Sequence, residues 1–276
     1  MLKKLCLFSI SLVMLLIASI TDAEVRVAIL DSGCNIKYEE GVSFVGNTLA
    51  DPSGHGTSIA KIIKKINPDA KLYIAKVFAQ NGQGLDTKPF VDGIYWAISR
   101  KVDVINMSWQ IRKDDKAIHD AIKKAYQNGI IIVAAAGNKC DFIDNLVVEL
   151  SKRNRKPNIT NDMRYPAKYD EVIAIGAINS FWRFNRYEKY SPIWLKIEFV
   201  CDGSYGSQSG TSFASARATG IISKIKRDYP NYNGSQLREM LRSYTHDLGD
   251  KGRDPKFGYG KLDYQDISSC IRLKSN

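Results

Sequence analysis

Residues 25–33 read VRVAILDSG, an apolar run that is followed at once by an aspartate and a turn. Five more apolar runs of strand length follow along the chain, and residues with helical spacing lie between several of them. This alternation predicts an α/β domain built on a mostly parallel sheet. The candidate strands are 25–30, 72–77, 102–107, 130–135, 172–177 and 197–200.

Three segments have the pattern of helices that pack on such a sheet. Apolar residues repeat at helical spacing in 59–66 and 117–125, and each run ends at a helix-stopping pair that contains asparagine. A third helix is predicted from about 212 to 228, where small residues such as Ala214 and Ala218 indicate burial. Pro230 ends it, because a proline disfavours helix in the residue before it.

The composition is that of an ordinary globular protein with one sizeable core. The chain has 276 residues, of which 44% are hydrophobic and 25% charged. We find no internal repeat, low-complexity tract or interdomain linker. Residues 24–276 are therefore expected to form a single domain.

The first 23 residues have the features of a secretory signal peptide. Lys3 and Lys4 precede an apolar run over 5–20, and small residues lead to a cleavage point after Ala23. An uncleaved membrane anchor is the weaker interpretation, because the run is shorter than the ~18 residues of a spanning helix. We expect an exported protein, secreted or periplasmic, without stable membrane insertion once the signal is cleaved.

The chain is strongly basic, with a formal net charge of +11, which loss of the signal lowers by one. The lysines and arginines are dispersed, and the densest cluster, 152–156, has the pattern of a solvated surface loop. A nucleic-acid or envelope-binding function would rest on charge alone. We expect no nucleic-acid partner.

Four cysteines remain after removal of the signal, at Cys34, Cys140, Cys201 and Cys270. An exported protein can form disulfides, and four cysteines allow three complete pairings, among which the sequence does not choose. Buried free thiols are an equal alternative. No cluster of cysteine and histidine suggests a zinc site.

Four polar residues follow predicted strands or open predicted helices. Asp31 follows the first strand and Asn138 follows the strand over 130–135, while His55 and Ser212 each begin a helix. Ligands of open α/β sheets gather at the carboxyl ends of the strands. Taken singly, each residue could be a turn or helix-cap residue without any catalytic role. Their joint placement favours one catalytic site.

The order of these residues and their flanking motifs resembles the subtilisin-like serine proteases. The motifs are Asp-Ser-Gly at 31–33, Gly-His-Gly-Thr at 54–57, Gly-Asn at 137–138 and Gly-Thr-Ser at 210–212. The resemblance covers nearly all of residues 25–263. It implies the three-layer α/β sandwich of that family, with a mostly parallel twisted sheet flanked by helices.

The resemblance also implies a catalytic triad of Asp31, His55 and Ser212, with Asn138 in the oxyanion hole. The function expected is a serine endopeptidase that acts on polypeptide substrates through an acyl-enzyme intermediate, without a cofactor.

Substrate-binding residues are inferred from the same family. Gly82 and Gly84 resemble the edge that pairs with an extended peptide, and Ser108 and Trp109 resemble the opposite wall of the cleft. Lys139 would border the primary specificity pocket, where it would disfavour a basic residue before the scissile bond. A solvated Lys139 without a role is equally compatible with the sequence.

Several positions depart from the family pattern. The first strand follows the predicted cleavage point directly, which leaves no room for a pro-domain. The short segment before Leu72 lacks the loop that holds calcium in many relatives, so we expect no metal there. Gln110 and Ala216 replace a glycine and a proline of the family. These departures keep open a second function, a subtilisin-fold binding or regulatory module with weak or no hydrolysis.

Overall fold

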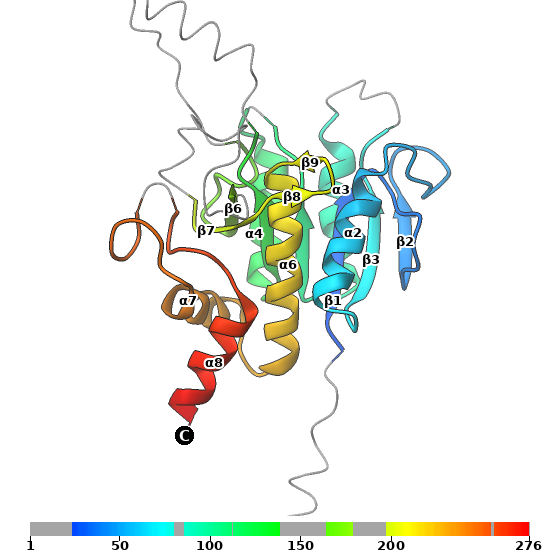
Figure 1. The fold of residues 1–276 in the computed structure, drawn as a ribbon. Helices are drawn as coiled ribbons and strands as arrows, with labels where there is room; N and C mark the ends of the chain where they lie inside the picture. Colours follow the sequence, from blue (N-terminus) through cyan, green and yellow to red (C-terminus); the bar gives the residue numbers. More distant parts are fainter. Residues whose placement is uncertain are drawn as a thin grey trace, which may run out of the picture.

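The computed structural model of the chain describes residues 24–79, 86–111, 113–138, 164–178, 197–254 and 257–275. Within this part, seven parallel strands form one sheet in the order β2-β3-β1-β4-β5-β6-β7 (Figure 1). The strands are β1 Arg26–Asp31, β2 Glu40–Ser43, β3 Lys71–Lys76, β4 Val104–Met107, β5 Ile131–Ala135, β6 Val172–Ile178 and β7 Phe199–Asp202.

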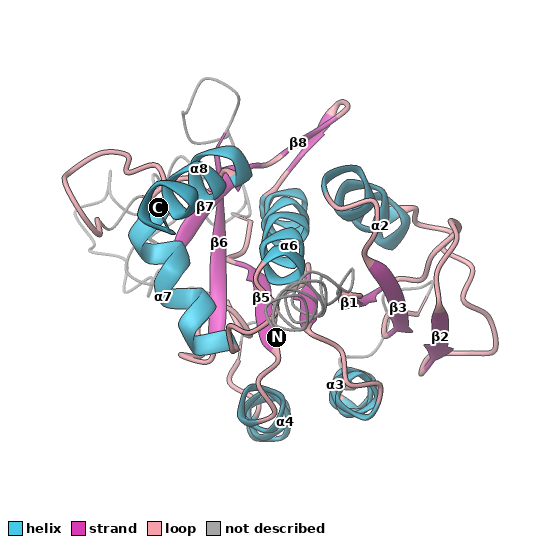
Figure 2. Ribbon diagram, turned by 90° about the horizontal axis from the view of Figure 1, so that it is seen from below, coloured by secondary structure: helices cyan, strands magenta, loops and turns pink. Residues whose placement is uncertain are grey.

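Helices cover both faces of the sheet and produce the expected three layers (Figure 2). On one face lie α2 (His55–Ile66) and α6 (Thr211–Asp228). The last two helices of the chain, α7 (Gly234–Tyr244) and α8 (Tyr264–Ser275), contribute to the same core. The opposite face carries α3 (Lys88–Ser99) and α4 (Lys116–Gln127). A small hairpin of β8 (Ser204–Tyr205) and β9 (Gln208–Ser209) precedes α6.

The first strand explains why this sheet reads as continuous apolar sequence. Val27 and Ile29 pack in the core beneath α2 and α6, whereas Ala28 and Leu30 pack in the core beneath α3 and α4. All four are completely buried. A parallel strand covered on both faces needs apolar residues at every position, without the alternation of a half-exposed strand.

The predicted elements are confirmed, with boundaries that move by up to a few residues. All six predicted strands form, and the predicted helices correspond to α2, α4 and α6. The sequence pattern did not indicate β2, a half-exposed strand at the sheet edge, or α3, α7 and α8.

The strand order positions the site. β1 lies between β3 and β4, so the chain crosses from one side of β1 to the other after β3. Such a switch point opens a crevice at the carboxyl ends of the neighbouring strands, where ligands of open α/β sheets bind. Asp31 is the last residue of β1 and therefore lies at this crevice.

Candidate active site

The four predicted site residues come from four elements that end or begin at the carboxyl ends of the sheet strands. Asp31 ends β1, and Asn138 follows β5. His55 is the first residue of α2, and Ser212 is the second residue of α6. Both helices pack against each other on the same face of the sheet and start at the same end of the molecule (Figure 1).

Asp31 and His55 form a direct pair. Oδ1 of Asp31 lies 2.8 Å from Nδ1 of His55 and also accepts a 2.8 Å hydrogen bond from the N–H of Ser32. The carboxylate is 2% exposed and the imidazole 36%. Since Nδ1–H donates to the carboxylate, the basic ring nitrogen is Nε2.

The environment raises the pKa of His55. Burial alone would lower it, but the hydrogen bond and negative charge of Asp31 raise it further than burial lowers it, and the charge of Asp51 adds to the increase. The imidazole therefore binds a proton more readily than a free histidine. This is the property required of a general base.

Ser212 presents its hydroxyl at the start of α6. Its Oγ donates a 3.0 Å hydrogen bond to the carbonyl oxygen of Ser108, so the hydroxyl is not bonded to His55 in this structure. Catalytic hydrogen bonds are often long or misaligned before substrate binds. The aromatic ring of Phe213 lies beside the imidazole, with the two ring centroids 6.0 Å apart.

The orientation of the Asn138 amide follows from its partners. Its Oδ1 accepts hydrogen bonds from the backbone N–H of Thr211 at 2.9 Å and from the Thr211 hydroxyl at 3.0 Å. Both partners are donors, so the oxygen must face them and Nδ2 must face the other way. Gly210 permits this approach, because a Cβ there would lie 3.0 Å from Nδ2.

The segment predicted as the cleft wall faces inward. Ser108 is 4% exposed, and its Oγ lies 2.9 Å from both Asn106 Oδ1 and Ser215 Oγ, which ties β4 to α6. Trp109 is 6% exposed and packs against Phe90, with ring centroids 4.4 Å apart and the ring planes tilted by 35°. Neither side chain forms a cleft surface, so any contact with a peptide would come from the backbone of this segment.

The side chain of Gln110 lies against Gly137, the residue before Asn138. A Cβ on Gly137 would be 2.4 Å from Oε1 of Gln110 and 3.0 Å from Cγ of Arg164. Gly137 also has a positive φ of 117°, a conformation that favours glycine. The side chains of Gln110 and Arg164 thus border the backbone next to the predicted oxyanion residue.

Three predicted substrate-binding residues, Gly82, Gly84 and Lys139, lie outside the described part of the chain. The same holds for Cys140 and for the side chain of Cys270. The other two cysteines, Cys34 and Cys201, are buried free thiols, and burial raises the pKa of both.

A buried carboxylate that the sequence analysis did not single out belongs to the same region. Asp51 is 3% exposed and accepts hydrogen bonds from Ser32, Ser53, Gly54 and Thr57, which surround the start of α2. Its place four residues before His55 was the available signal. An aspartate in a polar loop is usually solvated, so this signal had little weight.

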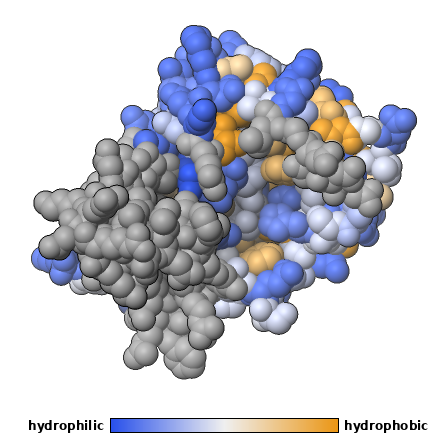
Figure 3. Space-filling model, turned by 90° about the horizontal axis from the view of Figure 1, so that it is seen from above, coloured by the Kyte–Doolittle hydropathy of each residue, from blue (hydrophilic) through white to orange (hydrophobic). Residues whose placement is uncertain are grey.

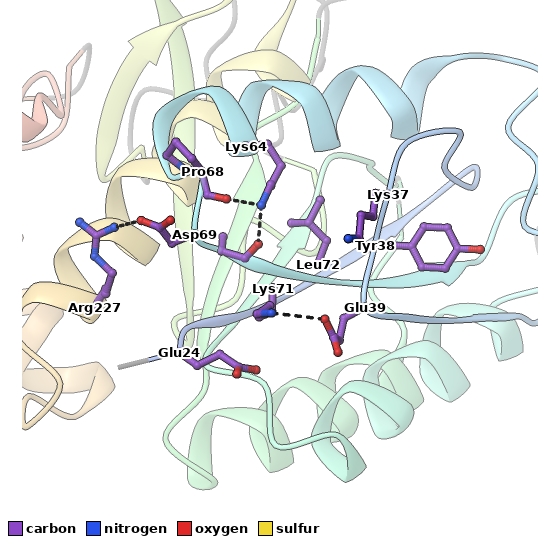
Figure 4. A pocket seen from close by; sticks show the side chains of 11 residues that line it. Glu24, Lys37, Tyr38, Glu39, Lys64, Pro68, Asp69, Lys71, Leu72 and Arg227 are labelled. Atoms are coloured by element: carbon purple, nitrogen blue, oxygen red, sulfur yellow. Dashed lines mark hydrogen bonds and ion pairs between the residues drawn. The ribbon is translucent and has the colours of Figure 1, made fainter. Parts of the chain in front are cut away.

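Figure 3 looks onto the end of the molecule that carries β8 and β9, where the described surface is largely hydrophilic with small hydrophobic patches. A pocket of about 460 Å³ lies elsewhere on the molecule (Figure 4). Its lining includes two ion pairs, one between Lys71 and Glu39 and one between Arg227 and Asp69. None of the proposed catalytic residues lines it.

Among the described residues, no group of three or more histidine, cysteine, aspartate or glutamate side chains is placed to hold a metal ion. In the same part of the chain, every helix is too short or too polar to cross a bilayer.

Comparison with known proteins identifies the family. Residues 22–260 match the profile of the subtilase family. The chain is 33% identical to the minor extracellular protease Epr of Bacillus subtilis (strain 168), across 90% of this chain and 39% of that protein. It is 34% identical to subtilisin DY of Bacillus licheniformis, across 87% of this chain and 88% of that protein. The chain thus spans well under half the length of the first of these relatives and most of the second.

Solved structures share the fold at lower sequence identity. A lanthipeptide protease superposes with a TM-score of 0.72 at 21% identity, covering 90% of this chain and 87% of that one. The protease domain of PatA, as an S218A mutant, superposes with a TM-score of 0.71 at 18% identity, covering 91% and 96%.

Proposed function

The chain belongs to the subtilase family, and we propose that it is a serine endopeptidase in which Asp31, His55 and Ser212 form the catalytic triad. The observation that carries the proposal is the 2.8 Å hydrogen bond between the buried Asp31 carboxylate and Nδ1 of His55. The pair lies at the carboxyl end of β1, on the side of the molecule where α6 begins with Ser212 as its second residue.

The first half of the reaction is acylation. The Ser212 hydroxyl turns from the Ser108 carbonyl toward His55, and its oxygen attacks the peptide carbonyl carbon while Nε2 takes the proton. Asp31 fixes the imidazole tautomer and stabilises the imidazolium that forms. The tetrahedral intermediate then collapses, the C–N bond breaks, and His55 returns the proton to the leaving amine.

Deacylation repeats these steps with water. His55 removes a proton from water, the hydroxide attacks the acyl carbon, and the proton goes back to Ser212 as the ester bond breaks. In both halves the oxyanion would be bound by Nδ2 of Asn138 and by the backbone N–H of Ser212. Two facts support this role for Asn138, namely the fixed orientation of its amide and the location of Ser212 at a helix N-terminus, which favours negative charge.

Substrate recognition is proposed to combine backbone pairing with a bordered specificity pocket. Gly82 and Gly84 on one side and the backbone of Ser108 and Trp109 on the other would hold an extended peptide. Lys139 would disfavour a basic residue before the scissile bond. A peptide library that showed strong preference for arginine or lysine at that position would contradict the role of Lys139.

We infer that the protein is exported and begins at Glu24 after cleavage of its signal peptide. The name of the Epr relative describes an extracellular protease, which supports export. N-terminal sequencing of the protein recovered outside the cytoplasm tests this, and an N-terminus that retains the apolar run would contradict it.

The activity is tested by hydrolysis of an unfolded polypeptide such as casein. Ser212→Ala should abolish hydrolysis above the background of the assay, because no nucleophile remains. Ser243→Ala, at an exposed serine on α7, is the matched control and should retain the activity of the unmodified protein. Equal hydrolysis by the unmodified protein and the Ser212→Ala variant would contradict the proposal.

A further inference from the structure

The buried carboxylate of Asp51 binds five donors with its two oxygens. Oδ1 accepts from the Ser32 hydroxyl at 2.9 Å, the Ser53 hydroxyl at 2.8 Å and the Gly54 N–H at 3.0 Å. Oδ2 accepts from the N–H of Thr57 at 2.8 Å and from its hydroxyl at 2.7 Å. So many donors to one carboxylate indicate that it is ionised.

These donors hold the first turn of α2, which carries His55. The residue at the N-cap position of this helix is Gly54, which has no side chain to cap the free N–H groups. Asp51 binds two of those groups from outside the helix, on Gly54 and Thr57. Ser53, held by Asp51, also accepts the N–H of His55 at 3.2 Å.

One hydroxyl lies between Asp51 and the catalytic pair. Oγ of Ser32 is 3.1 Å from Oδ1 of Asp31 and 2.9 Å from Oδ1 of Asp51, and it accepts the N–H of Gly56 at 3.0 Å. A hydroxyl has one proton to donate, so the two carboxylates compete for it. Whatever weakens Asp51 as an acceptor strengthens the hydrogen bond from Ser32 to Asp31.

We propose that Asp51 is a positioning residue for the general base, which fixes His55 through the first turn of α2 and increases its proton affinity through charge and through Ser32. This inference rests on the proposed function, in which His55 is the base. Asp51 makes no direct hydrogen bond to the imidazole, so it acts on His55 only through its charge and through the groups that it binds.

The pKa directions agree with this geometry. Burial would raise the pKa of Asp51, but the hydrogen bonds from Thr57, Ser53 and Ser32 outweigh burial and hold it below its ordinary value. The charge of Asp51 is also among the causes that raise the pKa of His55.

Other charged groups on the neighbouring elements are accounted for. On β1 the neighbour of His55 is Asp31 itself. On β3, the ammonium of Lys76 donates to the carbonyl oxygen of Ala50 at 2.6 Å, and on α6 Arg217 pairs with Asp202 at 3.8 Å. Among the described residues, this region also contains the thiol of Cys34, whose pKa burial raises, and Lys61 on the exposed side of α2.

The test measures the pKa of His55 by NMR titration in the Ser212→Ala background, so it needs folded protein and no activity. The chain has three histidines, and a His55→Ala variant assigns the signal. Asp51→Asn removes the charge and frees the Ser32 proton for Asp31. Both changes should lower the pKa of His55, by roughly 0.5–1 unit in total.

Ser32→Ala should change the pKa of His55 in the opposite direction. Without the Ser32 hydroxyl, Asp31 accepts one hydrogen bond fewer from a donor that competes with His55. The negative charge of Asp31 then acts more strongly on the imidazole, and the pKa of His55 should rise. This variant tests the Ser32 part of the proposal independently of whether Asp51→Asn folds. Asp120→Asn, at an exposed ion pair on α4, is the matched control and should leave the pKa unchanged.

In the enzyme with Ser212 intact, the acid limb of the kcat/KM profile should follow the same shifts. A His55 pKa that is unchanged in folded Asp51→Asn and Ser32→Ala variants would overturn the proposal and leave Asp51 a structural role only. The NMR result stands even if the protein hydrolyses nothing, so a failure of the proposed function would be seen separately.

Discussion

At the scale of single residues, the geometry assigns opposite tasks to the two atoms of the Asn138 amide. The oxygen is committed to Thr211, and the nitrogen is oriented away from it. An alanine at this position would therefore remove the proposed oxyanion donor and also leave the Thr211 N–H without its partner. A substitution that separates these two effects is more informative.

Asn138→Asp should keep both hydrogen bonds from Thr211 while replacing the Nδ2 donor by an acceptor. We expect kcat to fall by at least ~10²–10³, with a much smaller change in KM, because the donor acts mainly in the transition state. Steady-state kinetics on a peptide substrate measure this. Thr211→Ser, which retains the hydroxyl, is the control. A kcat within a few-fold of the unmodified protein would exclude Asn138 from the oxyanion hole.

The residues that the sequence did and did not reveal differ in a physical way. Asp31, His55, Asn138 and Ser212 were candidates from the sequence because each stands beside an apolar run or in a glycine-containing motif. Asp51 could not, because its burial depends on donors from a strand end, a loop and a helix that only the fold brings together.

At the scale of elements, β1 was predictable and the interior of α6 only partly so. The apolar residues of β1 predict a strand covered on both faces. The polar residues Asn106 and Thr219 do not indicate burial by their type, yet they are fully buried and form a 2.9 Å hydrogen bond between β4 and α6. Their pairing satisfies two polar groups that burial would otherwise destabilise.

Asp51 should make the start of α2 sensitive to acid. Its pKa in the folded protein is lowered, so its contribution to stability is fully present above the ordinary value of 3.8 and is lost as pH falls through the folded value. The unmodified protein should therefore melt at higher temperature than Asp51→Asn at neutral pH, and the two should converge below about pH 3.8. Thermal melts followed by circular dichroism test this. A difference that persists unchanged into acid would contradict the ionised state of Asp51.

The contact between α2 and α6 depends on Gly220. A Cβ at this position would lie 2.9 Å from Cβ of Ile66, closer than non-bonded carbon atoms normally approach. Gly220→Ala should therefore destabilise the protein by about 1–3 kcal/mol, although alanine is the better helix former. Urea unfolding measures the loss. Lys123→Ala, at an exposed position of α4, should change stability by less than about 0.5 kcal/mol. Equal or greater stability of Gly220→Ala would show that the helices are not in this contact.

At the scale of the whole molecule, one buried ion-pair cluster joins the C-terminal part to the sheet. Glu198, 4% exposed and next to β7, accepts hydrogen bonds from Nε of Arg238 at 2.7 Å and Nε of Arg242 at 2.8 Å, both on α7. Arg238 also donates to the carbonyl oxygens of Asp170 and Val172 near the start of β6. Three segments distant in sequence thus meet at the guanidinium of Arg238.

Glu198→Gln should destabilise the whole domain by about 3–5 kcal/mol, because two arginines lose their buried counter-charge. Urea unfolding measures this loss. Glu239→Gln removes an exposed partner of Arg242 and should cost at most about 1 kcal/mol. A similar small loss for both variants would mean that the cluster does not hold α7 on the sheet.

The proposed mechanism depends on whether His55 activates Ser212, and active-site labelling with a fluorophosphonate probe measures this activation directly. We predict one adduct, located by mass spectrometry on Ser212, that is lost in Ser212→Ala and strongly reduced in His55→Ala. No adduct on the folded protein, or labelling of Ser212 that does not require His55, would contradict this mechanism.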